Sequence, residues 1–368
     1  MLKNQEYYDV VIVGAGVAGL YLSNLLEKNG VDYVTFEKNK KIGKYGNRII
    51  SIEAFKKLNV EKSVIRKNIK EMDFLSPSGI KISKKDKKTR GYVVNLSSLE
   101  KGLFSNLKNK NKIFLNHPVK NADLNRGLLV VKNNKIRAKI IVFACGVSSN
   151  FLNKKFIKNS PRTIFCYTNE IRGKDKITTI IDNKKAHGFY AWIMPLSESI
   201  IEVGFGTDKF KKLSEKGFDE TLFSFPRINQ YKNSKKIKKI GGFIPTSIIK
   251  KRCGKNWILI GDASGGEALM GGSIHKSADE ALLAFNVIKR FIGKKISSLK
   301  EYDKTWEKTL GKDFYKQQSI RNILDQASNK ELDEVFKTVQ KNIPDGKGLI
   351  NELFKNIIIN LVKLKRRK

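Results

Sequence analysis

The chain has 368 residues, and its 73 lysines and arginines against 35 acidic residues give a formal net charge of +38. Apolar residues make up 40% of the chain and are gathered in periodic segments, which excludes a disordered protein and predicts a globular one. The charge predicts attraction to a polyanion, such as an anionic membrane surface, although a lysine-rich composition explains it equally well. No helix-turn-helix or zinc finger is apparent, so we expect no specific nucleic-acid partner.

The three cysteines, Cys145, Cys166 and Cys253, show no C-x-x-C spacing and have no histidine cluster beside them. We therefore expect no metal site and no disulfide framework, in keeping with a reducing, cytoplasmic setting. No stretch is long and apolar enough to span a bilayer. The expected location is the cytoplasm, with peripheral attachment to the inner face of the cell membrane.

The N-terminal part of the chain reads as a βαβ unit. Tyr8–Val13 is a predicted buried strand, "GAGVAG" opens a helix, and "VDYVTFEK" is a second strand that ends at Glu37. Two later apolar runs, 139–146 and 256–262, read as further buried strands of the same sheet.

Between these two runs, the segment of about residues 163–206 alternates β-branched and aromatic residues and predicts an antiparallel sheet. From about Ser298 the pattern is helical and basic, and residues 349–368 are amphipathic with a positively charged end that suits an anionic membrane surface. The predicted fold class is α/β with an α+β insert, in which a Rossmann-like domain is interleaved with an antiparallel β-sheet domain and followed by C-terminal helices. The expected boundaries are 1–70, 90–160 and 240–297 for the Rossmann-like domain, 71–89 and 161–239 for the β-sheet domain, and 298–368 for the basic C-terminal helical region.

The stretch "VIVGAGVAGL" supplies a G-x-G-x-x-G pattern between a strand and a helix. Gly14 permits a tight turn, Gly16 lets the backbone approach a pyrophosphate, and Gly19 lets helix and strand pack closely. Glu37 follows 18 residues after Gly19, at a strand end, where its carboxylate can accept hydrogen bonds from ribose hydroxyls. This context predicts dinucleotide binding.

A second glycine-rich junction, "GDASGGEALMGGSIHKSADEAL", favours FAD over NAD as the dinucleotide. FAD must also be held at its ribityl and isoalloxazine end, and Asp262 at a strand end can bond a ribityl hydroxyl. Gly265, Gly266, Gly271 and Gly272 would let backbone amides approach the cofactor. The helix that follows would direct its positive N-terminus at the flavin.

Together these segments resemble the flavoprotein superfamily with the p-hydroxybenzoate hydroxylase fold. Within it, "GFYAWIMPLSESIIEVGFG" (residues 188–206) resembles the Y-x-W-x-F-P…V-G-x-G segment of the geranylgeranyl reductase family, and "KIGKYGNRIIS" resembles that family's stretch after the ribose acid. The resemblance covers most of residues 7–300. It implies reduction of isolated C=C bonds in geranylgeranyl chains of archaeal-type membrane lipids or their precursors, with hydride from reduced FAD, a proton from an acid, and NAD(P)H or ferredoxin as external electron donor.

The resemblance and the two glycine-rich motifs give a set of expected site residues. Those expected to bind FAD are Gly14, Ala15, Gly16, Ala18, Gly19, Glu37, Lys38, Arg48, Ala144, Gly146, Gly261, Asp262, Gly271, Gly272, Ser273 and Ile274. Tyr190, Trp192, Met194 and Pro195 are expected to line a prenyl-chain slot, although Tyr190 and Trp192 share a strand face as ordinary core aromatics also do.

The sequence departs from the family pattern at three places. The acid of the superfamily's A-D-G segment is missing from Ala144-Cys145-Gly146, and Leu96 stands where an arginine is expected. Residues 38–52 contain no cysteine, so Tyr45 and His275 are the candidate proton donors.

Two other classes of function stay open at this point. One is an FAD-dependent aromatic monooxygenase or a lycopene-cyclase-like flavoprotein. The other is a non-catalytic flavin-binding or membrane-associating protein, which the missing acid and arginine leave open.

Overall fold

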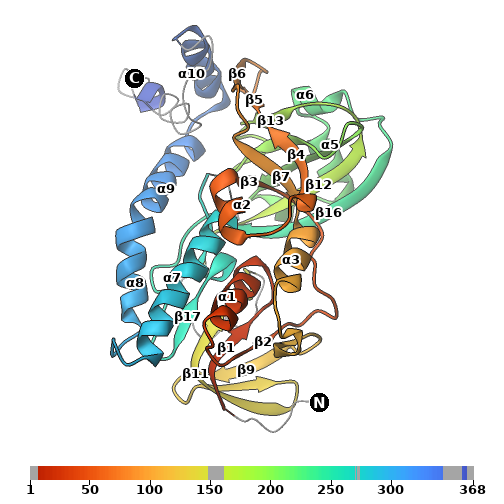
Figure 1. Cartoon of the computed structure of the whole chain (residues 1–368). Helices are drawn as coiled ribbons and strands as arrows, with labels where there is room; N and C mark the ends of the chain where they lie inside the picture. Colours follow the sequence, from red (N-terminus) through yellow and green to blue (C-terminus); the bar gives the residue numbers. More distant parts are fainter. Residues whose placement is uncertain (1–6, 148–160, 270, 272–273, 343–358, 363–368) are drawn as a thin grey trace. The chain divides into compact units, whose positions relative to one another are not determined.

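The computed structural model describes residues 7–147, 161–269, 271, 274–342 and 359–362 (Figure 1). The chain forms two compact units. The first comprises Met1–Val64, Val94–Arg162 and Pro245–Tyr315, and the second comprises Ile65–Val93, Thr163–Ile244 and Lys316–Lys368.

The first unit is built on a mostly parallel sheet. Its strands are β1 (Tyr7–Val13), β2 (Tyr33–Phe36), β8 (Ile113–Phe114), β9 (Val119–Asp123), β10 (Leu128–Val131), β11 (Asn134–Phe143) and β17 (Trp257–Leu259). The strands β8, β2, β1, β11 and β17 lie side by side in parallel, and β9 and β10 add an antiparallel extension along the first half of β11. The α/β class and the βαβ unit predicted from the sequence are confirmed.

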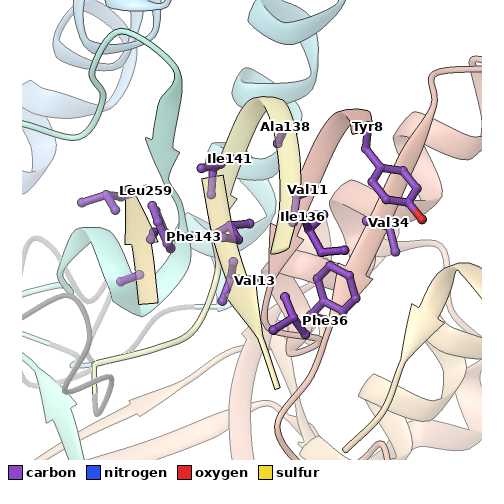
Figure 2. Packing of buried hydrophobic residues seen from close by; sticks show 14 of the residues in the cluster. Tyr8, Val11, Val13, Val34, Phe36, Ile136, Ala138, Ile141, Phe143 and Leu259 are labelled. Atoms are coloured by element: carbon purple, nitrogen blue, oxygen red, sulfur yellow. The ribbon is translucent and has the colours of Figure 1, made fainter. Parts of the chain in front are cut away.

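The middle strands of this sheet are buried on both faces, which explains their nearly continuous apolar sequences. In β1, Val11 and Val13 belong to an apolar cluster with residues of β2, β11 and β17 (Figure 2). Val10 and Ile12 point to the opposite face and have no exposed surface.

Helices of the first unit follow or cover these strands. They are α1 (Val17–Lys28), α2 (Ile52–Leu58), α3 (Leu96–Ser105), α7 (Ile274–Ile292) and α8 (Lys300–Trp306), and a short strand, β3 (Asn47–Ser51), precedes α2. The helix α1 packs against α3 and α7, and α8 packs against α7 (Figure 1). The start of α1 and the start of α7 thus belong to one layer of helices.

The second unit contains a seven-stranded sheet in the order β16-β12-β15-β14-β13-β5-β6. Its strands are β5 (Glu71–Leu75), β6 (Lys81–Lys85), β12 (Thr163–Arg172), β13 (Ile177–Ile180), β14 (Ala191–Pro195), β15 (Ile200–Thr207) and β16 (Lys236–Pro245). The run β12, β15, β14, β13 is antiparallel, as the sequence predicts, whereas β13 and β5 are parallel.

The second unit also contains β4 (Ile65–Ile69), α5 (Glu215–Leu222), α6 (Pro226–Asn229) and α10 (Asn329–Asn342). The strand β7 (Gly91–Asn95) pairs with β4 outside the seven-stranded sheet and includes the boundary between the two units. The helix α10 packs on β6, where the Gln340 side chain donates a hydrogen bond of 2.8 Å to the carbonyl of Lys81.

The C-terminal residues are shared between the two units, whose boundary falls within α9 (Lys312–Asp325). The sequence-based boundaries treat 298–368 as a region of its own, but α8 joins the first unit through α7 and α10 joins the second through β6. Residues 343–358 and 363–368, which hold most of the expected amphipathic tail, lie outside the described residues. No helix in the described part of the chain has the length and apolar character needed to cross a membrane.

Replacing Gly19 by Ala is expected to lower the free energy of unfolding by about 3 kcal/mol. A Cβ at this position would lie 2.0 Å from the carbonyl oxygen of Gly14, a backbone atom that cannot move aside without distorting the turn. The matched control is Gly102→Ala in α3, whose added Cβ would meet the side chains of Val60 at 3.4 Å and Val64 at 4.0 Å, both ordinary contact distances. Chemical denaturation should show the control unchanged or more stable by up to about 1 kcal/mol, and equal losses in both variants would contradict the packing explanation.

Candidate FAD-binding site

The three glycines of the motif, two before α1 and one in its first turn, have three different structural roles. Gly14 has a φ of +106°, and a Cβ there would lie 2.5 Å from the carbonyl oxygen of Ala144 on the neighbouring chain segment. Gly19 has no room for a side chain, because its Cα faces the carbonyl oxygen of Gly14 in the preceding turn. At Gly16 the nearest atom to an added Cβ would be a Glu100 carboxylate oxygen at 3.6 Å, so this glycine meets no protein backbone and leaves room beside the helix start.

The N-terminus of α1 is suited to bind a phosphate group. Its first residue outside the helix is Gly16, which carries no capping side chain. The amide groups of the first turn have no intrahelical acceptor, and the helix dipole favours negative charge there. Val17 and Ala18 form that turn, so the backbone itself offers the donors that the sequence predicts.

Glu37 connects the glycine turn to the end of β2. One carboxylate oxygen accepts the N–H of Ala15 at 2.8 Å, and the other accepts the N–H of Asn39 at 2.9 Å. The side chain is buried, and each oxygen keeps a lone pair for a ribose hydroxyl. Lys38, the next residue, is exposed.

A cavity of about 400 Å³ lies beside Glu37. Its lining residues are Ala15, Glu37, Asn39, Lys40, Lys41, Ile42, Gly43, Lys44 and Glu100. The cavity adjoins both the ribose acid and the helix start, which is the place where a nucleotide half of FAD would lie.

Glu100 is a member of this cavity that the sequence analysis misses. Its carboxylate is buried on α3 and accepts the N–H of Lys44 at 2.7 Å. Burial raises the pKa of Glu100, and the hydrogen bond from Lys44 opposes that shift. The signal was present in the sequence, because Glu100 lies on the same helical face as Leu96 and Leu103, where an acid is unexpected.

The second glycine-rich turn follows β17 and reaches α1 directly. Gly261 has a φ of +65°, and a Cβ there would lie 3.0 Å from the Cβ of Ala18. Because β1 and β17 flank β11 in parallel, both turns leave the carboxyl edge of one sheet. Two segments almost 250 residues apart in the sequence, Gly14–Gly19 and Gly261–Gly265, therefore meet.

Asp262 is a partly buried acid in this turn, and its carboxylate has no side-chain hydrogen bond to any described residue. Burial raises its pKa, and the positive charges of Lys276, Arg48 and Lys44 oppose the shift. A carboxylate in this state is a ready acceptor for a hydroxyl of a bound molecule.

Two of the glycines in this turn make room for the protein's own backbone. A Cβ on Gly265 would lie 2.3 Å from the carbonyl oxygen of Ser247, and one on Gly266 would lie 2.1 Å from that of Pro245. Gly266 also donates its N–H to the carbonyl of Ser247 at 3.0 Å. Backbone packing therefore requires glycine at both positions, and the expected approach of a cofactor to them stays a prediction.

The loop after this turn closes on itself before α7 begins. Gly271 has a φ of +81° and exchanges two backbone hydrogen bonds with Glu267, at 2.9 and 3.2 Å. Ile274 is the first residue of α7 and is buried. Gly272 and Ser273, which were expected to bind FAD, lie outside the described residues.

A buried ion pair fixes the shape of the Gly261–Gly265 turn. Lys276 lies 2.9 Å from Glu280 one turn later on α7, and neither side chain is more than 1% exposed. The Lys276 ammonium also donates to the carbonyls of Gly261 and Gly265, at 2.9 and 3.1 Å, and contacts the Ser264 hydroxyl.

The Glu280 carboxylate accepts hydrogen bonds from three groups besides Lys276. It accepts the N–H of Gly261 at 2.7 Å, the Ser264 hydroxyl at 2.8 Å and the Trp306 indole at 2.7 Å. Both charges are therefore paired and hydrogen-bonded, which is the condition for burying them. The sequence signal was a lysine and a glutamate at i and i+4 on one face of a helix, in line with the apolar Ala284 and Val287.

The remaining expected site residues of the first unit have structural contacts. Ala144 donates its N–H to the carbonyl of Val13 at 2.9 Å, and Gly146 has a φ of +73°. Arg48 is partly buried and donates to the carbonyl of Asn47 at 2.7 Å. Tyr45 is 40% exposed.

His275 serves as an acceptor in the structure. Its Nε2 accepts the N–H of Ser51 at 2.9 Å, and burial lowers its pKa, so the ring is neutral near pH 7. Leu96, in the place of the expected arginine, is buried on α3.

In the second unit, the Y-x-W motif and the V-G-x-G motif lie opposite each other on the paired strands β14 and β15. Trp192 on β14 pairs with Gly204 on β15, and a Cβ on Gly204 would lie 2.5 Å from the indole ring. Gly206 similarly makes room for Phe189, at 2.7 Å. The Y-x-W and V-G-x-G patterns thus describe one feature of the sheet. Aromatic rings of one segment pack on the glycines of the neighbouring strand, where no side chain occupies the space.

Of the four residues expected to line a substrate slot, Tyr190 and Trp192 are partly exposed, and Met194 and Pro195 are buried. The Tyr190 and Trp192 rings meet edge to face with centroids 6.0 Å apart. The Trp192 indole donates to Glu202 at 3.1 Å, which fixes the orientation of its ring.

The FAD binding domain family matches residues 7–72 of the chain. A digeranylgeranylglycerophospholipid reductase from Methanococcus vannielii is 28% identical over 367 residues, a stretch that covers 93% of each chain. The resemblance to geranylgeranyl reductases is confirmed. The chain is an FAD-dependent oxidoreductase.

Solved structures agree with this fold. A geranylgeranyl bacteriochlorophyll reductase-like protein from Thermoplasma acidophilum is 19% identical, with a TM-score of 0.83 over 98% of this chain and 99% of that one. The Klebsiella pneumoniae protein HpxO, complexed with FAD and uric acid, is 12% identical, with a TM-score of 0.70 over 98% of both chains.

The residues of the first unit fit FAD. A ribose acid after β2, an uncapped helix start after β1, and an acid after β17 without a side-chain hydrogen bond to described residues follow one another along one sheet edge. This is the order in which FAD carries its adenosine ribose, its diphosphate and its ribityl group. Among the described residues, no group of three His, Cys, Asp or Glu side chains could hold a metal ion.

Replacing Lys276 by Met is expected to lower the free energy of unfolding by about 3 to 5 kcal/mol, because it leaves the Glu280 charge buried and unpaired. The same variant should bind FAD more weakly, since the Gly261–Gly265 turn loses its anchor. Adding Glu280→Gln to Lys276→Met should restore part of the stability. Chemical denaturation and FAD fluorescence titration measure the two effects.

The control for this ion pair is Glu53→Gln, which breaks an exposed pair with Lys57, whose Nζ lies 3.5 Å from Glu53 Oε1. It should change stability by no more than about 0.5 kcal/mol. A Lys276→Met protein as stable as this control would show that the buried pair does not fix the turn.

Replacing His275 by Gln is expected to remove a pH dependence of stability. The folded protein keeps His275 neutral, whereas the unfolded chain takes up a proton below its ordinary pKa of about 6.5. The free energy of unfolding of the wild type should therefore fall, relative to that of the variant, as the pH drops below about 6.5. Gln can still accept the Ser51 N–H, so the two proteins should be similar at pH 8, and parallel curves from pH 8 to 5 would count against a depressed pKa.

Proposed function

We propose that the chain reduces C=C bonds in the geranylgeranyl chains of archaeal-type membrane lipids or their precursors. The observation that carries the proposal is the similarity to the Methanococcus vannielii reductase along 93% of both chains. The meeting of the two glycine turns supports it, because those turns provide the two holds that FAD needs. Bound FAD, once reduced, supplies hydride to one alkene carbon.

The chain's own residues would bind and orient the cofactor. The first turn of α1 donates N–H groups to the diphosphate, and Glu37 accepts the ribose hydroxyls. Asp262 accepts a ribityl hydroxyl, held in place by a turn that Lys276 and Glu280 anchor. Because the backbone of α1 and the carboxylates of Glu37 and Asp262 would make these contacts, the missing acid at Cys145 and the leucine at position 96 are compatible with FAD binding.

The second unit would supply the apolar surface for the prenyl chain. Tyr190 and Trp192 present ring surface, and Trp192 is fixed by its bond to Glu202. Met194 and Pro195 continue the same strand and are buried, and Met194 shares the strand face of Trp192. An apolar wall of this kind also keeps water from the alkene.

The second alkene carbon needs a proton from an acid. His275 is neutral and its Nε2 already accepts the Ser51 N–H, so we favour the Tyr45 phenol of the two candidates. The electrons for FAD would come from an external donor, NAD(P)H or ferredoxin. A lipid substrate also calls for attachment to the membrane surface from the cytoplasmic side.

The experiment is anaerobic reduction of a geranylgeranyl phospholipid by the purified protein. The flavin spectrum is recorded, dithionite reduces the flavin, and mass spectrometry follows the lipid. The expected product gains one hydrogen pair for each double bond reduced, with reoxidation of the flavin. Tyr45→Phe should slow this reoxidation by at least about 100-fold without loss of FAD affinity if the phenol is the proton donor.

Two outcomes would contradict the proposal. A folded protein that stays colourless and does not take up FAD excludes a flavin enzyme. Hydroxylation of an aromatic acid in air, with no change in the lipid, would indicate a monooxygenase.

A further inference from the structure

The strand β16 at one edge of the second unit's sheet is exposed on both of its faces. Seven of its ten residues are exposed, including residues of both alternating sets. Ile237 and Phe243 are 46% and 42% exposed, which is rare for large apolar side chains in this protein. We call this strand, together with its flanking lysines, the basic edge. Its cations are Lys232, Lys235, Lys236, Lys238 and Lys239.

The opposite edge of the same sheet shows what an ordinary protected edge looks like. In β6 the residues alternate between exposed and buried, with Lys81 and Lys85 outward and Ile82 inward. Lysines on an edge strand prevent pairing with other chains, and that explanation suffices for β6. It does not account for the exposed Ile237 and Phe243 of the basic edge.

A recess of about 1030 Å³ adjoins the basic edge. Lys216, Lys232, Lys236 and Lys239 line it, against the acids Asp219 and Glu220. The recess therefore carries more positive than negative charge and is suited to an anionic group.

Asp219 holds two of these lysines in place. Its carboxylate lies 2.9 Å from Lys236 and 3.2 Å from Lys239, and it accepts the Tyr167 hydroxyl at 2.8 Å. Burial works against the charged form, but the hydrogen bonds from Lys236 and Tyr167 keep the pKa of Asp219 well below its usual range. The acid stays ionised, so both cations are oriented beside the recess before any partner arrives.

We propose that the basic edge docks the protein on an anionic phospholipid bilayer, with lipid phosphates at the lysines and with Ile237 and Phe243 in the headgroup layer. Exposed cations beside exposed apolar side chains are the combination that binds such surfaces. A nucleic acid would use the lysines but would leave Ile237 and Phe243 without a role. The inference goes beyond the reduction chemistry and depends on neither FAD nor turnover.

Sedimentation of the full chain with vesicles tests this surface. The vesicles contain phosphatidylcholine with or without phosphatidylglycerol. Lys235→Gln/Lys238→Gln removes two cations of the basic edge and keeps Lys236 and Lys239, which lie beside Asp219. Ile237→Ser removes one exposed apolar side chain. Each variant should bind vesicles that contain phosphatidylglycerol at least about tenfold more weakly than the wild type does. The wild type and both variants should fail to bind vesicles of pure phosphatidylcholine.

The control is Lys81→Gln/Lys85→Gln on β6, which removes the same number of exposed cations from the other edge and should leave vesicle binding within about twofold. Equal losses in the control and in the basic-edge variant would mean that net charge alone drives binding, and would overturn the proposal. It would also be overturned if Ile237→Ser bound like the wild type. The melting temperature of each variant shows whether the fold is intact. We choose Ile237 rather than Phe243 for the substitution because the Phe243 ring packs against Phe165 and Phe210, so its loss would also affect the fold.

Competition with duplex DNA separates the two kinds of polyanion. If Lys235→Gln/Lys238→Gln lost DNA binding while its vesicle binding stayed normal, the surface would be a nucleic-acid site and the proposal would fail. Unchanged DNA binding with weakened vesicle binding supports the bilayer as the partner.

Discussion

The FAD-binding unit depends on the close approach of two chain turns at the carboxyl edge of one parallel sheet. Gly14 lies against the Ala144 carbonyl, Gly19 lies against Gly14, and Gly261 lies against Ala18. In each case a single added carbon would overlap an atom of the protein or come within 3.0 Å of one. The two turns can approach each other and the sheet because glycine leaves no side chain between their backbones. The cofactor site depends on this close backbone packing.

The sequence predicted the parts of this site that follow local rules. The apolar runs gave the buried strands, because strands covered on both faces need apolar residues at successive positions. The spacing of Gly14, Gly16 and Gly19 gave the turn, and the acid at the end of β2 gave Glu37. The antiparallel sheet of the second unit was likewise readable from its alternation.

The sequence could not predict which backbone each glycine meets. The motif alone explains Gly265 and Gly266 by the cofactor, whereas the structure shows that they also adjoin Ser247 and Pro245, a contact between segments that only the tertiary structure brings together. Glu100 and the pair of Lys276 and Glu280 were missed for a related reason. A charged residue on a helix is usually solvated, and the hydrogen bonds that permit its burial come from distant parts of the chain.

The ion pair beneath the Gly261–Gly265 turn has a consequence for cofactor exchange. Because its partners are all protein atoms, the turn keeps its conformation whether or not a ligand is present. An apoprotein stripped of flavin should then retain a preformed receptor for the ring and accept synthetic analogues, such as deazaflavin dinucleotides, without refolding. Reconstitution of this kind would allow the electronic properties of the ring to be varied while the polypeptide stays constant.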